Sequence, residues 1–263
     1  MYCIEHTTSY NYSESPKQAI QRMHLMPRSS TGQTVREWVI HLEGSEVMLS
    51  CNDHHGNIVH IAAQTKAKSE IVITASGMVE TEDTSGVLGQ HDNLLPLALY
   101  KKETYYCRMG PSLKMLAQEI PEKVDDVEFL HGLSQLITRN ITYKKGHTDS
   151  LTPAEVSTSL GFGVCQDHVH VFLTLARYVG FAARYVSGYM VTDTEDLNTE
   201  SHAWAEVYLK GLGWVGFDIS NQISPDEKYV RIASGFDYSD VQPVAGLRFG
   251  DGEETMTTQV IIQ

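Results

Sequence analysis

Three residues in the second half of the chain have the side chains of a nucleophilic centre. They are Cys165, His202 and Asp218, in the order thiol, imidazole, carboxylate. A thiolate attacks acyl carbons, an imidazole moves protons between the reacting groups, and a carboxylate fixes the tautomer of the imidazole and stabilises its charge. Each residue alone has an ordinary structural explanation. Together they predict acyl transfer through a thioester.

Cys165 stands at the start of a predicted helix that runs from Val164 to about Val179. It shares a helical face with Phe172, so its thiol should point toward the interior side of the first turn. Burial disfavours a thiolate, whereas a helix N-terminus and a nearby imidazolium favour one. The amide of Cys165 could also donate to a developing oxyanion. A buried structural cysteine is the alternative explanation of this segment.

His202 and Asp218 fall on two neighbouring predicted strands. Strand alternation puts His202, Trp204, Glu206 and Tyr208 on one face and the small and apolar residues on the other, so we expect His202 to face a cleft or solvent beside a large indole. A three-residue loop, 210–212, would pair Trp204 with Asp218 and leave His202 diagonally opposite, roughly 7–8 Å away between backbones. Asp218 could instead cap the turn formed by Ser220 and Asn221.

Three segments of the second half also carry a family resemblance: GVCQDHVHVFLTLARYVGFAARYVSGY, SHAWAEVYLKGLGWVGFDIS and DYSDVQPVAG. They resemble the bacterial transglutaminase-like superfamily, in its group of predicted cysteine proteases. YNYSESPKQAIQRMHLMPR and CNDHHGN resemble the β-rich N-terminal region of the same group. The resemblance implies a papain-like arrangement, with Cys165 as nucleophile, His202 as general base and acid, and Asp218 as the partner of His202.

Two positions depart from the pattern of that family. Ile219-Ser220 stands where proline and threonine commonly follow the aspartate, and His168-Val169 stands where an aromatic and a small residue are more usual. The first departure could alter a turn while keeping the carboxylate, and the second could reshape a wall of the pocket. Gln166 and Tyr143 are both candidates for a second oxyanion donor.

Other clusters of polar residues predict no metal or cofactor. Asp53, His54 and His55 fall in a turn that we expect to be solvated. Helical spacing places His168 beside Cys165 but turns His170 about 140° away, so one zinc ion could not easily take both. The acidic run that contains Glu195, Asp196 and Glu200 lacks a calcium-loop pattern. We expect a solvated acidic loop there, or a lid beside the site.

The remaining pattern predicts two domains and an α+β fold class. Six segments between Met1 and Val79 alternate like strands, so residues 1–110 are expected to form an N-terminal antiparallel β-sandwich. Residues 111–263 are expected to form a papain-like, transglutaminase-like catalytic domain of helices packed on an antiparallel sheet. Its predicted helices include an apolar stripe from Val127 to Ile141 and a capping box at Thr152–Glu155, followed by Gly161 as helix stop. The last residues, 255–263, alternate like a strand.

Composition and charge limit the classes of molecule that the protein is expected to bind. The formal net charge of −13 argues against nucleic-acid and membrane partners. No secretory signal or membrane-length apolar run is seen, and the four cysteines lack disulfide spacing, so a cytoplasmic location is expected. The expected substrate is a peptide or protein. A homo-oligomer is left open, because the N-terminal domain could present substrate, wall off the cleft or mediate dimerisation.

The favoured function is a thiol-dependent hydrolase, a cysteine peptidase or amidase acting on peptide or isopeptide-type amides. One alternative is protein-glutamine transglutaminase activity, because an amine can intercept the same thioester in place of water. The other is a non-catalytic peptide-binding module, against which the presence of all three residues argues.

Overall fold

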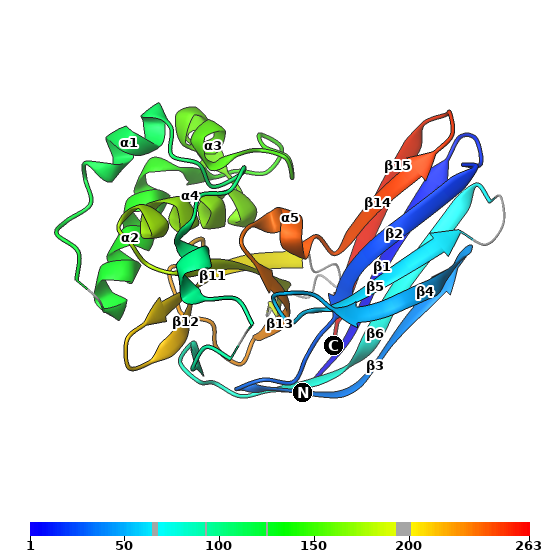
Figure 1. Cartoon of the computed structure of the whole chain (residues 1–263), viewed down its shortest axis with the longest axis horizontal. Helices are drawn as coiled ribbons and strands as arrows, with labels where there is room; N and C mark the ends of the chain where they lie inside the picture. The colour runs from blue at the N-terminus through cyan, green and yellow to red at the C-terminus, as the bar shows by residue number, and fades with distance from the viewer. Residues whose placement is uncertain (65–67, 93, 125, 193–200) are drawn as a thin grey trace.

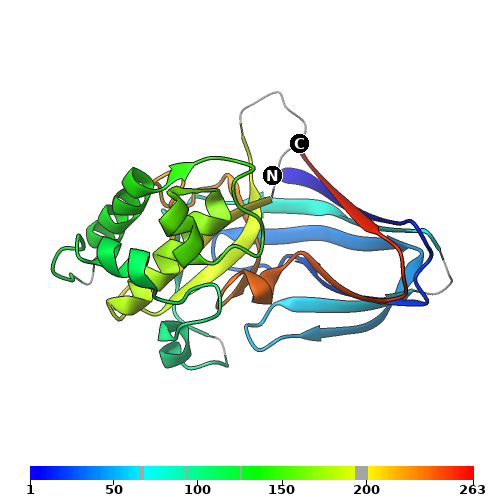
Figure 2. The ribbon, with the colours of Figure 1, turned by 90° about the horizontal axis from the view of Figure 1, so that it is seen from above.

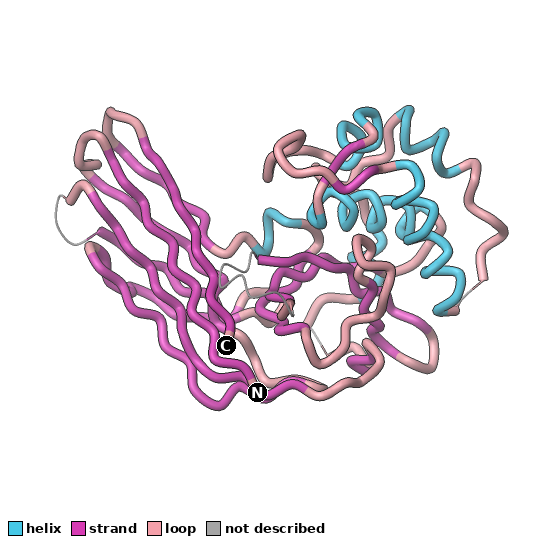
Figure 3. The backbone as a smooth tube through the Cα atoms, turned by 180° about the vertical axis from the view of Figure 1, so that it is seen from behind, coloured by secondary structure: helices cyan, strands magenta, loops and turns pink. Residues whose placement is uncertain are grey.

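The computed structural model describes residues 1–64, 68–92, 94–124, 126–192 and 201–263. Strands and helices occupy different regions of the molecule. A long two-layered β structure forms one arm, and the helices gather over one sheet in the other arm (Figures 1 and 3). Seen from above, most helices lie on the side of the second sheet away from the β arm, whereas the short helix at 238–241 lies between the two arms (Figure 2). This mixed fold of mostly antiparallel sheets confirms the predicted α+β class.

The β arm is a sandwich of two four-stranded sheets with the orders β15-β1-β6-β3 and β14-β2-β5-β4. Alternating apolar residues of both sheets face each other and form its core, with Tyr10, Met23 and Ile73 almost fully buried. The six predicted N-terminal strands are each present, within two residues at either end. The eight strands are β1 (Tyr2–Tyr12), β2 (Gln18–Met26), β3 (Gln33–Glu43), β4 (Ser45–Asn52), β5 (Ile58–Gln64), β6 (Glu70–Thr81), β14 (Val244–Phe249) and β15 (Glu254–Ile262).

The second arm is built on a five-stranded antiparallel sheet with the order β13-β10-β11-β12-β7. Helix α4 lies against β10 and β11, and α2 and α3 pack on α4. No helix in the described ranges has both the length and the apolar character needed to cross a bilayer. The elements are β7 (Val87–Gly89), η1 (Leu97–Lys101), α1 (Pro111–Ala117), α2 (Val127–Asn140), β8 (Thr142–Tyr143), α3 (Ala154–Leu160), β9 (Phe162–Gly163), α4 (Cys165–Tyr178), β10 (Ala183–Met190), β11 (Ser201–Leu209), β12 (Gly213–Phe217), β13 (Tyr229–Gly235) and α5 (Tyr238–Val241).

The hairpin between β11 and β12 has the predicted register. Leu209 pairs with Gly213, which leaves the three-residue loop 210–212, and Ala205 pairs with Phe217. Continued by one residue, this register sets Trp204 opposite Asp218. An odd-numbered loop keeps even-numbered residues of both strands on one face, so His202 and Asp218 share a side.

The helix ends follow sequence signals, with one exception. Asp126 caps α2 by accepting from the Phe129 amide at 2.7 Å, and Gly161 ends α3 in the left-handed conformation with φ 70°. The predicted capping box at the start of α3 is wrong. Glu155 instead accepts hydrogen bonds from two amides of the first turn of α1, at 2.8 and 3.1 Å, so its carboxylate caps a neighbouring helix.

Both ends of the chain contribute to the sandwich. The predicted C-terminal strand is present as β15, but it pairs with β1, and β14 pairs with β2. Conversely β7, which precedes residue 110, pairs with β12 of the second sheet. Strand pairing therefore differs from the expected division at residue 110, because the chain returns to the first arm after completing the second.

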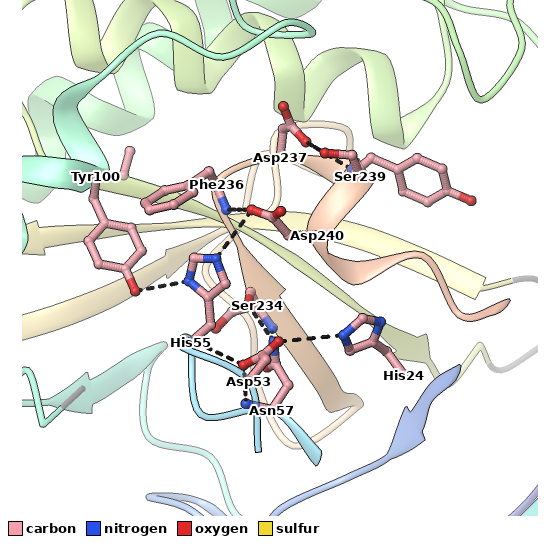
Figure 4. A network of polar contacts seen from close by, with 12 residues as sticks. His24, Asp53, His55, Asn57, Tyr100, Ser234, Phe236, Asp237, Ser239 and Asp240 are labelled. Atoms are coloured by element: carbon pink, nitrogen blue, oxygen red, sulfur yellow. Dashed lines mark hydrogen bonds and ion pairs between the residues drawn. The ribbon is translucent and has the colours of Figure 1, made fainter. Parts of the chain in front are cut away.

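Two residues of the turn at 53–57, His55 and Asn57, are buried against the second arm, and Figure 4 shows their contacts. The His55 ring lies between Tyr100 Oη and Asp240 Oδ2, each at 3.2 Å, and Asn57 exchanges hydrogen bonds with the backbone of Ser234 at 2.8 and 2.9 Å. Asp53 accepts from the His55 and Asn57 amides. The expectation of a solvated turn is wrong for His55, whose buried ring joins one arm to the other, whereas His54 is exposed as expected.

Candidate active site

Cys165 is the first residue of α4, and the chain before it is held on both sides. Gly163 is the last residue of β9, which pairs in parallel with β8, and its carbonyl accepts a hydrogen bond from the Lys144 amide at 2.8 Å. The Asp167 carboxylate accepts from the Val164 amide at 2.8 Å and from the Thr148 hydroxyl at 2.7 Å. A Cβ on Gly163 would lie 2.6 Å from the Asp167 Cβ, so only glycine permits this close approach.

Cys165 is half-buried and packs against the main core, as the helical face predicted. It lines a cleft of about 520 Å³ that also contains His202. The walls come from the loop before α4, from the ends of β10 and β11, and from β15 of the sandwich. The lining residues are Tyr143, Lys145, Val164, Cys165, Gln166, Met190, Thr192, Ser201, His202, Thr258 and Val260.

His202 and Asp218 form a short hydrogen bond behind this cleft. His202 Nε2 lies 2.6 Å from Asp218 Oδ2, and the Asp218 side chain is fully buried. This bond uses Nε2, so Nδ1 is the ring nitrogen left for the thiol of Cys165. The structure thereby brings the base and its carboxylate partner together, and puts the base in the same cleft as the thiol.

Two further residues hold the Asp218 carboxylate. Tyr229 Oη donates to Oδ2 at 2.6 Å and Asn221 Nδ2 donates to it at 2.8 Å, while the Asn221 amide donates to Oδ1 at 3.1 Å. Asp218 therefore both orients His202 and caps the turn that follows β12, so the two expectations for this residue are met by its two oxygens. The sequence pattern did not indicate Tyr229.

The electrostatics of the pair favour a charged imidazole. Burial opposes protonation of His202, but the hydrogen bond to Asp218 and the neighbouring Cys165 outweigh it and raise the His202 pKa to about 10. Burial also opposes ionisation of Asp218, yet the bonds from His202, Tyr229 and Asn221 lower its pKa. At neutral pH the ring is an imidazolium beside a carboxylate.

The face of β11 that carries His202 borders the cleft only at His202. Trp204 is 2% exposed, and its indole stacks near the His202 ring with centroids 6.4 Å apart. Glu206 is fully buried and accepts from Arg184 Nε at 2.5 Å and Arg231 Nε at 2.8 Å. His202 thus faces the cleft beside the Trp204 indole, as expected, and Tyr229 and Arg231 of β13 contact Trp204 and Glu206 on the rest of this face.

The two candidates for a second oxyanion donor, Gln166 and Tyr143, both line the cleft. Gln166 Nε2 donates to the Ser150 carbonyl at 2.9 Å, so part of its hydrogen-bonding capacity is used. The amide of Cys165 belongs to the first turn of α4, whose N–H groups have no partner within the helix. The role of each group toward an oxyanion stays a prediction.

His168 serves the scaffold of the site. Its ring is buried, with Nε2 donating to the Ile141 carbonyl at 3.1 Å and Nδ1 accepting from Ser220 Oγ at 3.0 Å. Burial lowers the His168 pKa, which keeps the ring neutral for these two bonds. His170 points into the core, where it stacks on Tyr106. Neither ring is arranged with Cys165 to bind a metal.

Of the other two metal candidates, the structure describes only the turn at Asp53. Within the described residues, no cluster of three or more His, Cys, Asp or Glu side chains is arranged to hold an ion. Asp53 and His55 take part in the buried contacts between the arms. Glu195, Asp196 and Glu200 lie outside the described residues.

The remaining thiols differ from Cys165 in their surroundings. Cys3 and Cys51 are exposed on the sandwich, far in sequence from any imidazole of the cleft. Cys107 is fully buried, and burial raises the pKa of its thiol to about 11. Of the four cysteines, Cys165 is the one beside the imidazole of His202.

Comparison with known proteins agrees with these features. Residues 114–219 match the family model described as transglutaminase-like superfamily, and residues 2–80 match the model of the bacterial transglutaminase-like N-terminal region. The first match ends one residue after Asp218 and contains all three candidate residues. The resemblance inferred from the motifs is confirmed.

Similar proteins share nearly the whole length of the chain. An uncharacterized protein of Mycobacterium leprae is 24% identical over 278 residues, covering 98% of this chain and 97% of that protein. One from Mycobacterium tuberculosis is 26% identical over 281 residues, covering 97% and 90%. The crystal structure of "a Putative Cysteine Protease from Cytophaga hutchinsonii" has a TM-score of 0.77 at 20% identity, covers 100% of this chain and 89% of that one, and shows the same fold.

Proposed function

We propose that this chain, whose residues 114–219 match the transglutaminase-like superfamily, is a cysteine hydrolase of peptide or isopeptide-type amides. Cys165 is the nucleophile, His202 the proton carrier and Asp218 its partner. The observation that carries the proposal is the 2.6 Å bond between His202 and the buried Asp218, at a cleft that Cys165 also lines. An imidazolium held beside a thiol favours the thiolate.

The acylation step follows from this charge distribution. The Cys165 thiolate attacks the carbonyl carbon, and the carbonyl oxygen becomes an oxyanion that backbone N–H groups at the α4 N-terminus can stabilise. When the intermediate collapses, the C–N bond breaks and the His202 imidazolium gives its Nδ1 proton to the leaving amine. The products are a free amine, a thioester on Cys165 and a neutral imidazole.

Deacylation reverses the proton movement. Neutral His202 takes a proton from water as the water oxygen attacks the thioester carbon. Collapse of the second intermediate breaks the C–S bond, releases a carboxylic acid and restores the thiolate–imidazolium pair. Throughout, Asp218 holds the ring by its Nε2–H and stabilises the imidazolium, as in other triads. An amine in place of water would give a new amide, the transglutaminase outcome.

A product analysis tests the proposal and separates these outcomes. The protein is incubated with a peptide mixture, with and without a fluorescent primary amine, and the products are identified by mass spectrometry. We expect new carboxyl termini or deamidated side chains that are absent with Cys165→Ser. Amine incorporation exceeding hydrolysis would favour transglutaminase activity. Peptide binding without turnover, retained in Cys165→Ala, would favour a binding module and contradict the proposal.

A further inference from the structure

We propose that an extended segment of the substrate binds as an added strand along the open edge of β15. This inference rests on the proposed function, because it assigns a substrate-binding surface to the cleft of Cys165 and His202. It commits to one occupant, a peptide in β conformation, recognised mainly through its backbone. Extended peptides bind sheet edges in this way in several kinds of proteins.

The hydrogen bonds of β15 determine which backbone groups face the open edge. The Cys3 amide donates to the Gln263 carbonyl at 2.8 Å, and the Gln263 amide donates to the Cys3 carbonyl at 2.9 Å. Such two-bond pairs recur at every second residue of an antiparallel ladder, and the β1–β15 register is continuous. Odd-numbered residues of β15 therefore bond to β1. The backbone groups of even-numbered residues point away from β1: Met256, Thr258, Val260 and Ile262.

This edge is open among the described residues. β15 is the last strand of its sheet, and β1 is the one strand with which it pairs. Exposed edges usually carry charges or proline that discourage pairing with another chain. Glu254, the first residue of β15, is charged and lies 3.5 Å from Arg248, whereas residues 255–263 contain neither charge nor proline. Among the described residues, the outward amides and carbonyls of Met256 and Thr258 therefore have no strand partner.

The edge runs into the catalytic cleft. Thr258, an exposed residue whose backbone groups point outward, lines the cleft together with Cys165 and His202. Val260 also lines the cleft, but it is 1% exposed, so the open part of the edge ends at Thr258. In Figure 1, β14 and β15 lie on the side of the sandwich that faces the helical arm. A strand added to β15 would therefore lead its next residues toward the thiol. This continuity favours a substrate over a second copy of the chain, which would block the cleft by edge-to-edge pairing.

The test compares two electrophiles that differ only in length. Acetyl-hexa-alanine chloromethyl ketone and acetyl-alanine chloromethyl ketone carry the same reactive group, and both alkylate a cleft thiol. We expect the long probe to modify Cys165 at least about tenfold faster than the short one, because only the long probe can form backbone hydrogen bonds along the β15 edge. A rate ratio near one on the unaltered protein overturns the inference.

A matched pair of variants locates the effect. Thr258→Pro removes an outward N–H without breaking the β1 ladder, since proline is tolerated at such edge positions. Thr258→Val keeps the N–H and removes only the hydroxyl. We expect the ratio of rates to fall several-fold in Thr258→Pro and to stay unchanged in Thr258→Val. An unchanged ratio in folded Thr258→Pro contradicts binding at β15.

Two further measurements guard the interpretation. If Thr258→Pro does not fold, hexa-alanine probes N-methylated at one position at a time are used on the unaltered protein. Rates that fall at alternate positions support strand addition, and rates without alternation contradict it. Failure of the proposed function would appear differently. Both probes would then label Cys165 slowly, while the long probe would still react about tenfold faster than the short one. A dimer in sedimentation that Thr258→Pro dissociates would identify a second copy as the occupant and overturn the inference.

Discussion

Ser220 Oγ lies 3.0 Å from His168 Nδ1 and joins the end of the strand that carries Asp218 to the helix that carries Cys165. Both residues stand at positions where the sequence differs from the pattern of the family that it resembles. The structure brings them into contact, so they form one feature. Because the other nitrogen of His168 is bonded to the Ile141 carbonyl, the ring also joins both segments to the end of α2.

A double-mutant cycle measures this link. We expect His168→Phe to lower the free energy of unfolding by about 1–3 kcal/mol, since it leaves the Ile141 carbonyl and the Ser220 hydroxyl unpaired. Ser220→Ala should cost about 1 kcal/mol. If the contact between His168 and Ser220 stabilises the fold, the loss of unfolding free energy in the double variant should be smaller than the sum of the two single losses. We expect a difference of about 0.5–1.5 kcal/mol in urea denaturation. Full additivity would show that the contact contributes nothing.

The Asp218 carboxylate should determine the alkaline limit of activity. In the proposed mechanism the imidazolium of His202 gives a proton to the leaving amine. Because the His202 pKa is raised to about 10, kcat/KM should fall as pH rises through about 10. In Asp218→Asn the main cause of the elevation is gone. We expect the alkaline limit to move toward pH 6.5, the ordinary pKa of histidine, and activity to fall by about 10³–10⁴.

Asp226→Asn is a suitable control for that profile. Its carboxylate caps a nearby turn through the Lys228 amide at 2.9 Å. Its alkaline limit should match that of the unaltered protein. The His202–Asp218 pair also makes folding depend on pH. The elevated pKa of His202 stabilises the folded chain fully below pH 6.5, and this stabilisation should be lost as pH rises through about 10. An alkaline limit that Asp218→Asn does not move would contradict this role.

Glu206 should be one of the most sensitive positions for stability. It is fully buried between Arg184 and Arg231, whose side chains are 7% and 19% exposed. Glu206→Gln removes the charge and leaves two guanidinium groups without their counter-ion, so we expect the free energy of unfolding to drop by about 3–5 kcal/mol. Glu80→Gln, which breaks the exposed pair with Arg36, should change it little. If the two substitutions lowered the free energy of unfolding equally, the idea that burial makes the Glu206 ion pairs critical would be wrong.

The parts of the fold that could be predicted are those encoded by local patterns. Alternation gave the six N-terminal strands, and glycine at 161 gave the end of α3. An odd-numbered loop between β11 and β12 was enough to place His202 and Asp218 on one side. These features depend on residues close together in sequence, where period and turn geometry decide the outcome.

Features that depend on distant partners could not be predicted in this way. Glu155 has the spacing of a capping box, yet an adjacent helix offers its amides to the carboxylate. The turn at Asp53 looks solvated until the second arm covers it. Tyr229 belongs to β13, a strand that the sequence pattern did not predict. Its hydroxyl reaches Asp218 through the order of strands in the sheet. Alternation in 255–263 predicts a strand but cannot name β1 as its neighbour.

The most direct test of the catalytic centre is competitive alkylation by iodoacetamide at pH 7, with each cysteine followed by mass spectrometry. Cys165 is half-buried whereas Cys3 and Cys51 are exposed, so access alone would make Cys165 slower. We predict that Cys165 reacts at least about tenfold faster than the other three, because His202 favours its thiolate, and that His202→Gln abolishes this preference. Labelling of Cys165 no faster than Cys3 and Cys51, or a preference unchanged in His202→Gln, would contradict an activated thiol.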